Sequence, residues 1–178
     1  MLPAAQSYLF QAPTGVAGDI TRSDESNVEP AMLVGVGSNP VVYPSAFGVP
    51  VKYVAGGIQQ FNGGAEAAAD FAGVLVREVP GISGSSADDS VANGTGSPYP
   101  SVPQGLCVRG YVNVVCAHGT PARGGAVYIQ IIANGGIAVG AFRADADGDN
   151  TIVLSATQAE WASDGMDANK NAELRIAR

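Results

Sequence analysis

The chain has 178 residues, a size that a single β-sandwich or β-barrel domain reaches and that can bury about 70% of its unfolded surface. Nine Lys and Arg against sixteen Asp and Glu give a net charge of −7, which disfavours a nucleic-acid partner because phosphate binding needs clustered cations. Charged residues make up only 14% of the chain, which suggests that part of the surface is buried against partners.

Residues 1–27 are expected to form an extended N-terminal arm. Tyr8, Leu9 and Phe10 make a small apolar cluster without strand or helix periodicity, and Pro and Gly residues interrupt the chain after it. Such an arm docks on its own domain or on a neighbour, and a frayed terminus is the alternative. The N-terminus lacks a signal-peptide pattern, and no stretch approaches the ~20 apolar residues of a membrane helix, so we expect no membrane partner.

Residues 28–178 are expected to form one β domain, because short β-branched and aromatic runs alternate with Gly, Pro and Asn turns. The expected strands are 28–36, 49–55, 58–61, 71–79, 105–117, 126–133, 137–144, 151–156 and 171–177. The glycines at 56–57 and the Asn-Gly-Gly at 134–136 predict hairpin turns. Eight or nine short strands indicate an all-β fold, either a compact β-barrel or a jelly-roll-like sandwich.

The stretch 105–132 is expected to be the centre of this domain. It reads as strand, turn and strand, and predicts that 105–117 and 126–133 are buried and antiparallel to each other. Cys107 and Cys116 are separated by an odd number of positions in one strand, so they should point to opposite faces. Two buried reduced thiols are therefore expected in place of a disulfide.

Residues 81–104 are the main irregular segment, rich in Gly, Ser, Asp and Pro. A structureless stretch of this length is uncommon within a compact domain and is usually functional or disordered. We expect a long surface loop there.

The chain has one histidine, His118, which lies two residues from Cys116 at the end of a predicted strand. A Cys–His pair for hydrolysis is conceivable at this spacing, but no nucleophile motif accompanies it. Three Cys and His residues in total are too few for a typical zinc site. No catalytic or cofactor-binding residue is therefore predicted, and an enzyme is not expected.

The acidic run Asp145–Asp149 is the one metal-like pattern in the sequence. Alternating carboxylates around a Gly can bind calcium, but an EF-hand loop needs Gly at its sixth position and Glu at its twelfth. Asn150 and Ala156 occupy those positions here. We therefore expect a solvated acidic turn and no metal ligands.

Several short motifs, spread from the arm to the last strand, carry a resemblance to a known family through their order and spacing. They are Gly18-Asp-Ile-Thr-Arg22 with Val28-Glu-Pro30, Phe71-Ala-Gly-Val-Leu-Val-Arg-Glu78, Gln104-Gly-Leu-Cys-Val-Arg-Gly-Tyr-Val112, Gly119-Thr-Pro-Ala-Arg-Gly-Gly-Ala-Val-Tyr128 and Ala172-Glu-Leu-Arg-Ile176. With these motifs the chain resembles the structural cement, or head-decoration, proteins of tailed bacteriophages.

This resemblance implies a structural protein without an active site. Such proteins sit as dimers or trimers on the outside of the phage head, after synthesis in the host cytoplasm, and bridge neighbouring major capsid protein subunits. The candidate contacts to the capsid or to a second subunit are Tyr8, Leu9, Phe10, Ile20 and Arg22.

A carbohydrate-binding or adhesin-type β-sandwich is the alternative from another functional class. Trp161 and the tyrosines would supply its aromatic platform, and calcium at Asp145–Asp149 would support it. Binding to phage heads, compared with retention on a glycan column, separates the two hypotheses.

Overall fold

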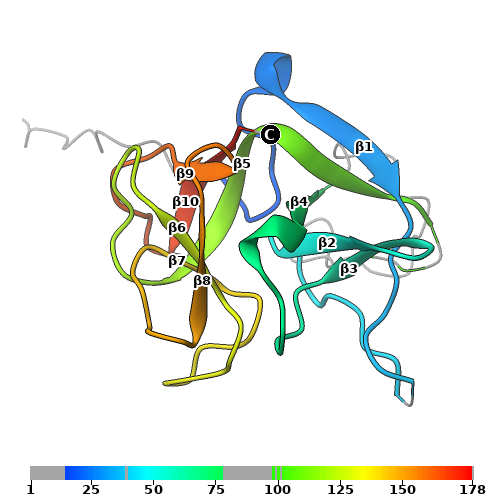
Figure 1. Cartoon of the computed structure of the whole chain (residues 1–178). Coiled ribbons are helices and arrows are strands. Elements are labelled where there is room, and N and C mark those ends of the chain that lie inside the picture. Colours follow the sequence, from blue (N-terminus) through cyan, green and yellow to red (C-terminus); the bar gives the residue numbers. More distant parts are fainter. Residues whose placement is uncertain (1–14, 39, 78–97, 99, 101, 178) are drawn as a thin grey trace, which may run out of the picture.

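The computed structural model describes residues 15–38, 40–77, 98, 100 and 102–177 (Figure 1). These residues form ten β-strands and two 3-10 helices, and none of them lies in an α-helix. The 3-10 helices are η1 (Ser23–Glu25) and η2 (Ala68–Asp70). The strands are β1 (Asn27–Ala31), β2 (Pro50–Val54), β3 (Gly57–Gln60), β4 (Phe71–Val76), β5 (Gln104–His118), β6 (Val127–Gln130), β7 (Phe142–Arg143), β8 (Thr151–Leu154), β9 (Ala159–Trp161) and β10 (Asn171–Ile176). In this part of the chain no helix has the length and apolarity needed to cross a membrane.

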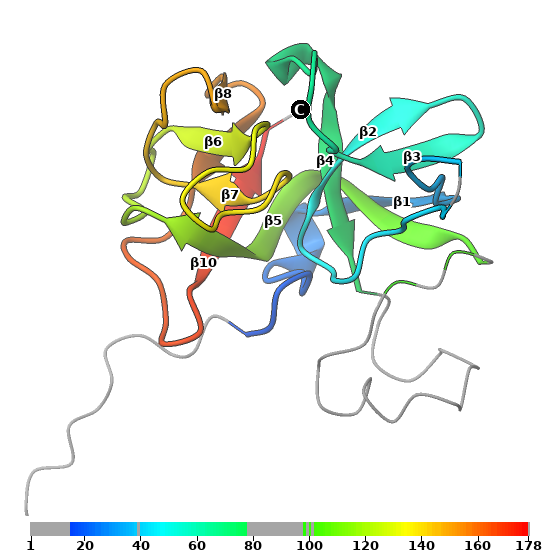
Figure 2. The same ribbon diagram turned by 90° about the horizontal axis from the view of Figure 1, so that it is seen from below.

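Strand β5 runs through the middle of the molecule and belongs to both of its halves (Figures 1 and 2). Its first half pairs with β1 and β4, and β2 and β3 lie beyond β4. Its second half pairs with β10 and β7, and β9, β6 and β8 lie beyond these. We call residues 27–77 and 104–109 the β1–β4 lobe, and residues 110–177 the β6–β10 lobe.

Gly110 lies where β5 passes from one lobe to the other, and its φ of 123° favours glycine. A Cβ atom at Gly110 would lie 2.2 Å from the Oγ of Ser26. The same Ser26 hydroxyl accepts a hydrogen bond from the backbone N–H of Tyr111 at 3.2 Å. The missing side chain therefore lets residues preceding β1 approach β5 at this point.

The core consists of two hydrophobic clusters that share β4. Its residues point into both: Phe71, Val74 and Val76 into the larger cluster, and Ala72 and Leu75 into the smaller one. The larger cluster continues into the β6–β10 lobe, where the rings of Phe71 and Phe142 meet edge-on with centroids 6.5 Å apart. All of β4 is buried, which explains its continuous apolar sequence, and each large side chain buried there contributes about 2 kcal/mol.

Several predicted strands are confirmed. β2 and β3 form the predicted hairpin, although its two-residue turn is Ala55-Gly56 and not Gly56-Gly57, and β4 begins at Phe71 as predicted. β10 is the predicted closing strand, with alternate buried residues Ala172, Leu174 and Ile176. Cys107 and Cys116 are both free and buried, as expected, but both side chains belong to the larger core cluster, where opposite faces were expected.

The all-β fold class is confirmed, with ten strands where eight or nine were expected. The main path through the sheet runs β3-β2-β4-β5-β7-β6-β8, and in the described part of the chain its two ends do not pair with each other. The sheet mixes parallel and antiparallel pairs. The domain is therefore an open, sandwich-like β fold and not a closed barrel.

The predicted strands 105–117 and 126–133 are largely buried and run antiparallel to each other, as expected, but they do not pair directly as the two strands of a hairpin. β7 lies between them, parallel to β5 and antiparallel to β6. The connection 119–126 is longer than the loops of about 2–5 residues that join hairpin strands. It leaves room for β7, which is followed by a hydrogen bond from the N–H of Ala144 to the carbonyl of His118 at 2.9 Å.

Other predicted strands are shorter or divided. The expected strand 137–144 is reduced to β7, and 28–36 becomes β1 followed by single bridges from Leu33 to Ile58 and from Val36 to Val42. Trp161, which lies outside the expected strands, ends β9. The predicted loop 81–104 lies mostly outside the described residues, and its last residue, Gln104, begins β5.

Candidate functional site

The described part of the predicted arm lies along β5 of its own chain. Gly18 donates its N–H to the carbonyl of Asn113 at 2.8 Å, Asn113 donates to Asp19 at 2.9 Å, and Thr21 donates to Tyr111 at 3.1 Å. These bonds make residues 18–21 an added strand segment beside β5, where Ile20 forms a bridge with Val112. Residues 15–26 are thus attached to the centre of the fold.

Ile20 and Arg22 are brought close together on this segment. Ile20 is partly buried against the larger core cluster. The guanidinium of Arg22 lies 3.8 Å from the ring centroid of Tyr111 and 2.9 Å from a carboxylate oxygen of Glu173, whose hydrogen bond raises the pKa of Arg22. Both side chains therefore fasten the arm to the domain, and the other three candidates, Tyr8, Leu9 and Phe10, lie outside the described residues.

Cys116 and His118 do not form a nucleophile–base pair. The thiol of Cys116 lies 3.1 Å from the backbone carbonyl of His118, and burial raises the pKa of this thiol. The imidazole of His118 instead lies 2.9 Å from the carboxylate of Asp145. A nucleophilic cysteine needs a stabilised thiolate, so this arrangement gives no support to a Cys–His hydrolase.

The acidic turn Asp145–Asp149 surrounds a buried arginine. The side chain of Arg143 is 5% exposed and pairs with both Asp145 and Asp147, at 3.1 Å each. Asp147 also accepts a hydrogen bond from the side chain of Asn134 at 2.9 Å, and Gln130 accepts one from Arg143 at 2.9 Å. The two carboxylates thus serve as counter-ions that hold the loops around β7 together.

These contacts favour the ionised carboxylates. Burial raises the pKa of Asp145, but hydrogen bonds from Arg143 and His118 outweigh it and leave the pKa below its usual value. The pKa of Asp147 is also lowered, first by the hydrogen bond from Asn134 and then by the one from Gln130. Across the described residues, no three Asp, Glu, His or Cys side chains converge in a way that would hold a metal ion.

Trp161 cannot serve as a binding platform, because its side chain is only 1% exposed and belongs to the larger core cluster. The carbohydrate-binding alternative therefore loses its principal aromatic residue. Tyr43 and Tyr53 are exposed, and both lie in the β1–β4 lobe.

The prominent surface feature of the β1–β4 lobe is a projection that the sequence reasoning missed. Val36 and Val42 exchange two backbone hydrogen bonds, of 2.7 and 2.9 Å, at the base of a two-stranded projection seen at the lower right of Figure 1. We call residues 36–38 and 40–43 the finger. Val41, Val42 and Tyr43 are exposed on it, with Val42 at 58%.

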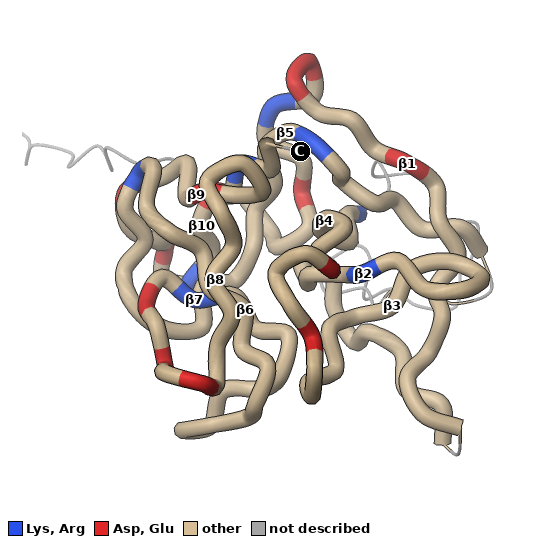
Figure 3. The backbone as a smooth tube through the Cα atoms, in the orientation of Figure 1, with Lys and Arg blue, Asp and Glu red and all other residues tan. Residues whose placement is uncertain are grey.

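The finger lies within a long uncharged stretch, because residues 30–51 contain no Asp, Glu, Lys, Arg or His. Figure 3 shows the finger without charged positions, although acidic and basic residues lie on β1, on β2 and before β4 of the same lobe. Exposed apolar residues that cluster on an uncharged surface mark an interaction site. The absence of charge from residues 30–51 can be seen in the sequence, but the sequence does not show that part of this stretch projects from the domain.

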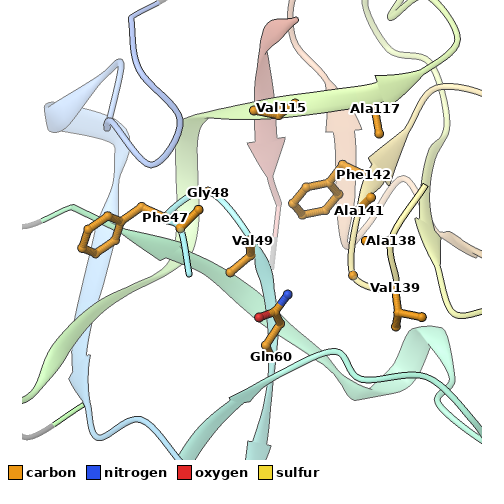
Figure 4. Close-up of a pocket in the computed structure, with 12 residues that line it drawn as sticks. Phe47, Gly48, Val49, Gln60, Val115, Ala117, Ala138, Val139, Ala141 and Phe142 are labelled. Carbon is orange, nitrogen blue, oxygen red and sulfur yellow. The ribbon is translucent and has the colours of Figure 1, made fainter. Parts of the chain in front are cut away.

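An apolar groove of about 220 Å³ lies on the surface between the two lobes (Figure 4). Its walls are residues 46–49 from the β1–β4 lobe and residues 138–142 from the β6–β10 lobe. Val115 and Ala117 of β5 also line it, and Gln60 contributes a polar side chain. Val115 is 43% exposed here although its neighbours Val114 and Cys116 are fully buried.

Comparisons with known proteins place this fold in a family. A family model described as "Structural cement protein (E217 gp24/Pam3 gp6)" matches residues 4–177. A chain of the solved structure "The capsid of Myoviridae Phage XM1" is similar with a TM-score of 0.59 and 16% identity, over 95% of this chain and 94% of that chain, which shows a shared fold. No curated protein matches the sequence. The family match spans nearly the whole chain and confirms the resemblance found in its motifs, so the chain belongs to the phage structural cement protein family and is a capsid-stabilising structural protein.

Proposed function

We propose that this protein sits on the outer surface of the phage head, where it binds the major capsid protein and bridges neighbouring subunits without catalysing a reaction. The family match over residues 4–177 is the observation that carries the proposal. The low charge content and the apolar finger support it, because both suit a protein whose surface is covered by partners. When one contact to a subunit has formed, the effective concentration for the next contact is high, so the affinity of each single contact can be modest.

The arm is proposed as one of the contacts. Its interface residues would be Tyr8, Leu9 and Phe10, with Ile20 and Arg22 at the root of the arm. Attachment of residues 18–21 to β5 supports this role, because a contact made by the preceding residues is then linked directly to the centre of the domain. Apolar and aromatic side chains are typical anchors of protein interfaces.

Deleting residues 1–14 tests the arm while keeping the segment that is attached to β5. The truncated chain should keep its β circular dichroism and its melting temperature, because the described hydrogen bonds all remain. It should bind less well to heads from which the native protein has been stripped, and it should protect them less against heating.

A triple substitution, Tyr8→Ser with Leu9→Ser and Phe10→Ser, serves as the matched variant of full length. Equal binding of wild type, truncated chain and triple variant would show that the arm makes no contact that matters. If wild-type protein itself does not rebind stripped heads, the proposed outer-surface role is contradicted.

A further inference from the structure

The tripeptide Asn-Gly-Gly occurs at two places in the described part of the chain, residues 62–64 and residues 134–136. Asparagine is a chemically labile residue, and a following glycine makes it more so, because the unhindered backbone nitrogen can attack the side-chain amide. The two tripeptides are identical, so they have the same intrinsic reactivity. A difference between them in the folded protein must therefore come from the fold.

The first tripeptide is protected by Glu66. The carboxylate of Glu66 accepts hydrogen bonds from the N–H of Asn62 at 3.0 Å and from the N–H of Gly63 at 2.9 Å. Glu66 is buried and paired with Lys52, which also donates to the side-chain oxygen of Asn62 at 3.1 Å. The nitrogen of Gly63 can attack only after it loses its proton, and the adjacent carboxylate opposes the negative charge that this loss produces.

The second tripeptide has no such protection. Asn134 and Ile137 exchange backbone hydrogen bonds of 3.3 and 2.9 Å, and the turn between them is exposed in the loop that follows β6 (Figure 1). Within the described residues the N–H of Gly135 donates no hydrogen bond. A Cβ atom at Gly135 or Gly136 would meet nothing within 4 Å. Solvent can therefore take the proton of Gly135, and the turn can change shape without breaking packing contacts.

The side chain of Asn134 belongs to the polar network around Arg143. Its amide nitrogen donates to Asp147 at 2.9 Å, and the same carboxylate pairs with Arg143 at 3.1 Å. A carboxylate at position 134 has no proton to donate at neutral pH and carries the same charge as Asp147. Conversion of Asn134 to an acid would thus replace a hydrogen bond by a repulsion, at the point where the loop after β6 is attached to Asp147.

We propose that Asn134 is a site of spontaneous deamidation, and that this modification loosens the loops of the β6–β10 lobe as the protein ages. The nitrogen of Gly135 loses its proton and forms a bond to Cγ of Asn134, while the Cγ–Nδ2 bond breaks and Nδ2 leaves as ammonia with that proton. Water then opens the succinimide ring at either carbonyl group and gives aspartate or isoaspartate at position 134. Because the reaction consumes only water and belongs to the chain in any setting, it is independent of the proposed function.

Peptide mapping of the full chain after prolonged incubation at mildly alkaline pH tests the site. Trypsin cleaves after Lys and Arg, so peptides 53–77 and 124–143 separate Asn62 from Asn134, and both from the Asn-Gly at 93–94 that lies outside the described residues. In the folded protein Asn134 should deamidate at least ~10-fold faster than Asn62, because the hydrogen bond to a carboxylate that protects the first tripeptide must break before reaction. In concentrated urea the two rates should become similar, because the two tripeptides then have the same surroundings.

Two results of this mapping would overturn the proposed site. One is a folded chain in which Asn134 reacts no faster than Asn62. The other is a folded chain in which neither residue reacts, although both react in urea.

Variants of the full chain test the effect on the lobe. Asn134→Asp carries the charge of the modified protein, and it should unfold at a lower urea concentration than wild type. Asn134→Gln keeps an amide, but its longer side chain does not close the succinimide ring. Incubation should therefore lower the urea midpoint of wild type towards that of Asn134→Asp and leave that of Asn134→Gln unchanged.

An Asn134→Asp chain as stable as wild type would show that the modification does not loosen the lobe, and would overturn this part of the proposal. So would an equal fall of the midpoint in wild type and in Asn134→Gln. None of these measurements uses phage heads, so a negative result leaves the cement role standing.

Discussion

The two lobes share β5 but use their side chains differently. The β6–β10 lobe contains three ion pairs within itself: those of Arg143 with Asp145 and with Asp147, and that of Arg175 with Glu160. Within the described residues of the β1–β4 lobe, Lys52 forms an ion pair with Glu66. Apolar side chains of this lobe are exposed on the finger and on β1. One lobe thus uses polar groups to hold its own loops, and the other keeps an uncharged surface available for partners.

The largest expected effect tests whether the lobes fold as one unit. Val114→Asp in β5 or Ile129→Asp in β6 should abolish soluble folded protein, because both side chains are fully buried in the larger cluster and an unpaired buried charge costs several kcal/mol. Expression level and circular dichroism are the measurements. Val115→Asp, one residue along on the exposed face of β5, is the matched control and should fold.

Independent folding of the two lobes would contradict this prediction. If either core variant retained a folded β1–β4 lobe, seen as partial β circular dichroism with a cooperative melt, the larger cluster would not couple the lobes.

A smaller loss is expected from Arg143→Met. This change leaves Asp145 and Asp147 without their shared counter-ion and should cost about 2 kcal/mol, less than the roughly 3–5 kcal/mol of a fully buried pair because both carboxylates are partly exposed. Urea unfolding gives the free energy. Arg123→Met, at an exposed position of the same lobe, is the control and should change stability little.

A wild-type-like stability for Arg143→Met would mean that the polar network does not hold the loops of the β6–β10 lobe. The contrast between the lobes would then be one of surface charge alone.

Acid should weaken the same network. The pKa values of Asp145 and Asp147 are lowered in the folded protein, so the ionised carboxylates stabilise the fold above the unfolded pKa of about 3.9. That contribution is lost as the pH falls through the lower folded values. The urea midpoint of wild type should therefore drop towards that of the double variant Asp145→Asn with Asp147→Asn as the pH falls from neutral to about 3. A difference between the two proteins that persists in acid would contradict this mechanism.

The smallest effect is expected from the finger. Val42→Ser should leave the melting temperature within about 2 °C of wild type, because a surface substitution changes stability by less than ~0.5 kcal/mol. Differential scanning calorimetry on the full chain is the measurement. A clear fall in melting temperature would show that the finger stabilises its own lobe. It would contradict the view that the finger serves partner binding and not the stability of the β1–β4 lobe.

Local sequence patterns predicted a large part of the fold. Each of three elements could be predicted from residues that are adjacent in the sequence. They are β4 with its continuous apolar run, β10 with its alternating pattern, and the tight turn between β2 and β3. The pairing of β5 with β7 was not predictable in this way, because β7 has only two residues and its partner lies 26 positions earlier, from Cys116 to Phe142. Trp161 entered β9 because burial of its ring, and not a local strand pattern, decides its place.

The candidate site was less predictable than the fold. Motif order led to the family, but the arm residues were chosen from a local cluster, and two of them turn out to contact their own domain. The absence of charge from 30 to 51 could have been read from the sequence as the sign of a covered surface. The groove could not, because its lining comes from four segments that only the folded chain brings together.

The two buried cysteines give each lobe its own chemical reporter. Cys107 pairs with β1 and β4, and Cys116 pairs with β7, so the two residues lie on opposite sides of the junction at Gly110, although both side chains pack in the larger core cluster. Burial raises the pKa of Cys107 to about 11 and also raises that of Cys116, so neither thiol is reactive until its strand is uncovered. The rate at which a small alkylating reagent modifies each cysteine would therefore show whether the strands around the two thiols open together or separately, and the same measurement on intact particles would show which of the two regions the head protects.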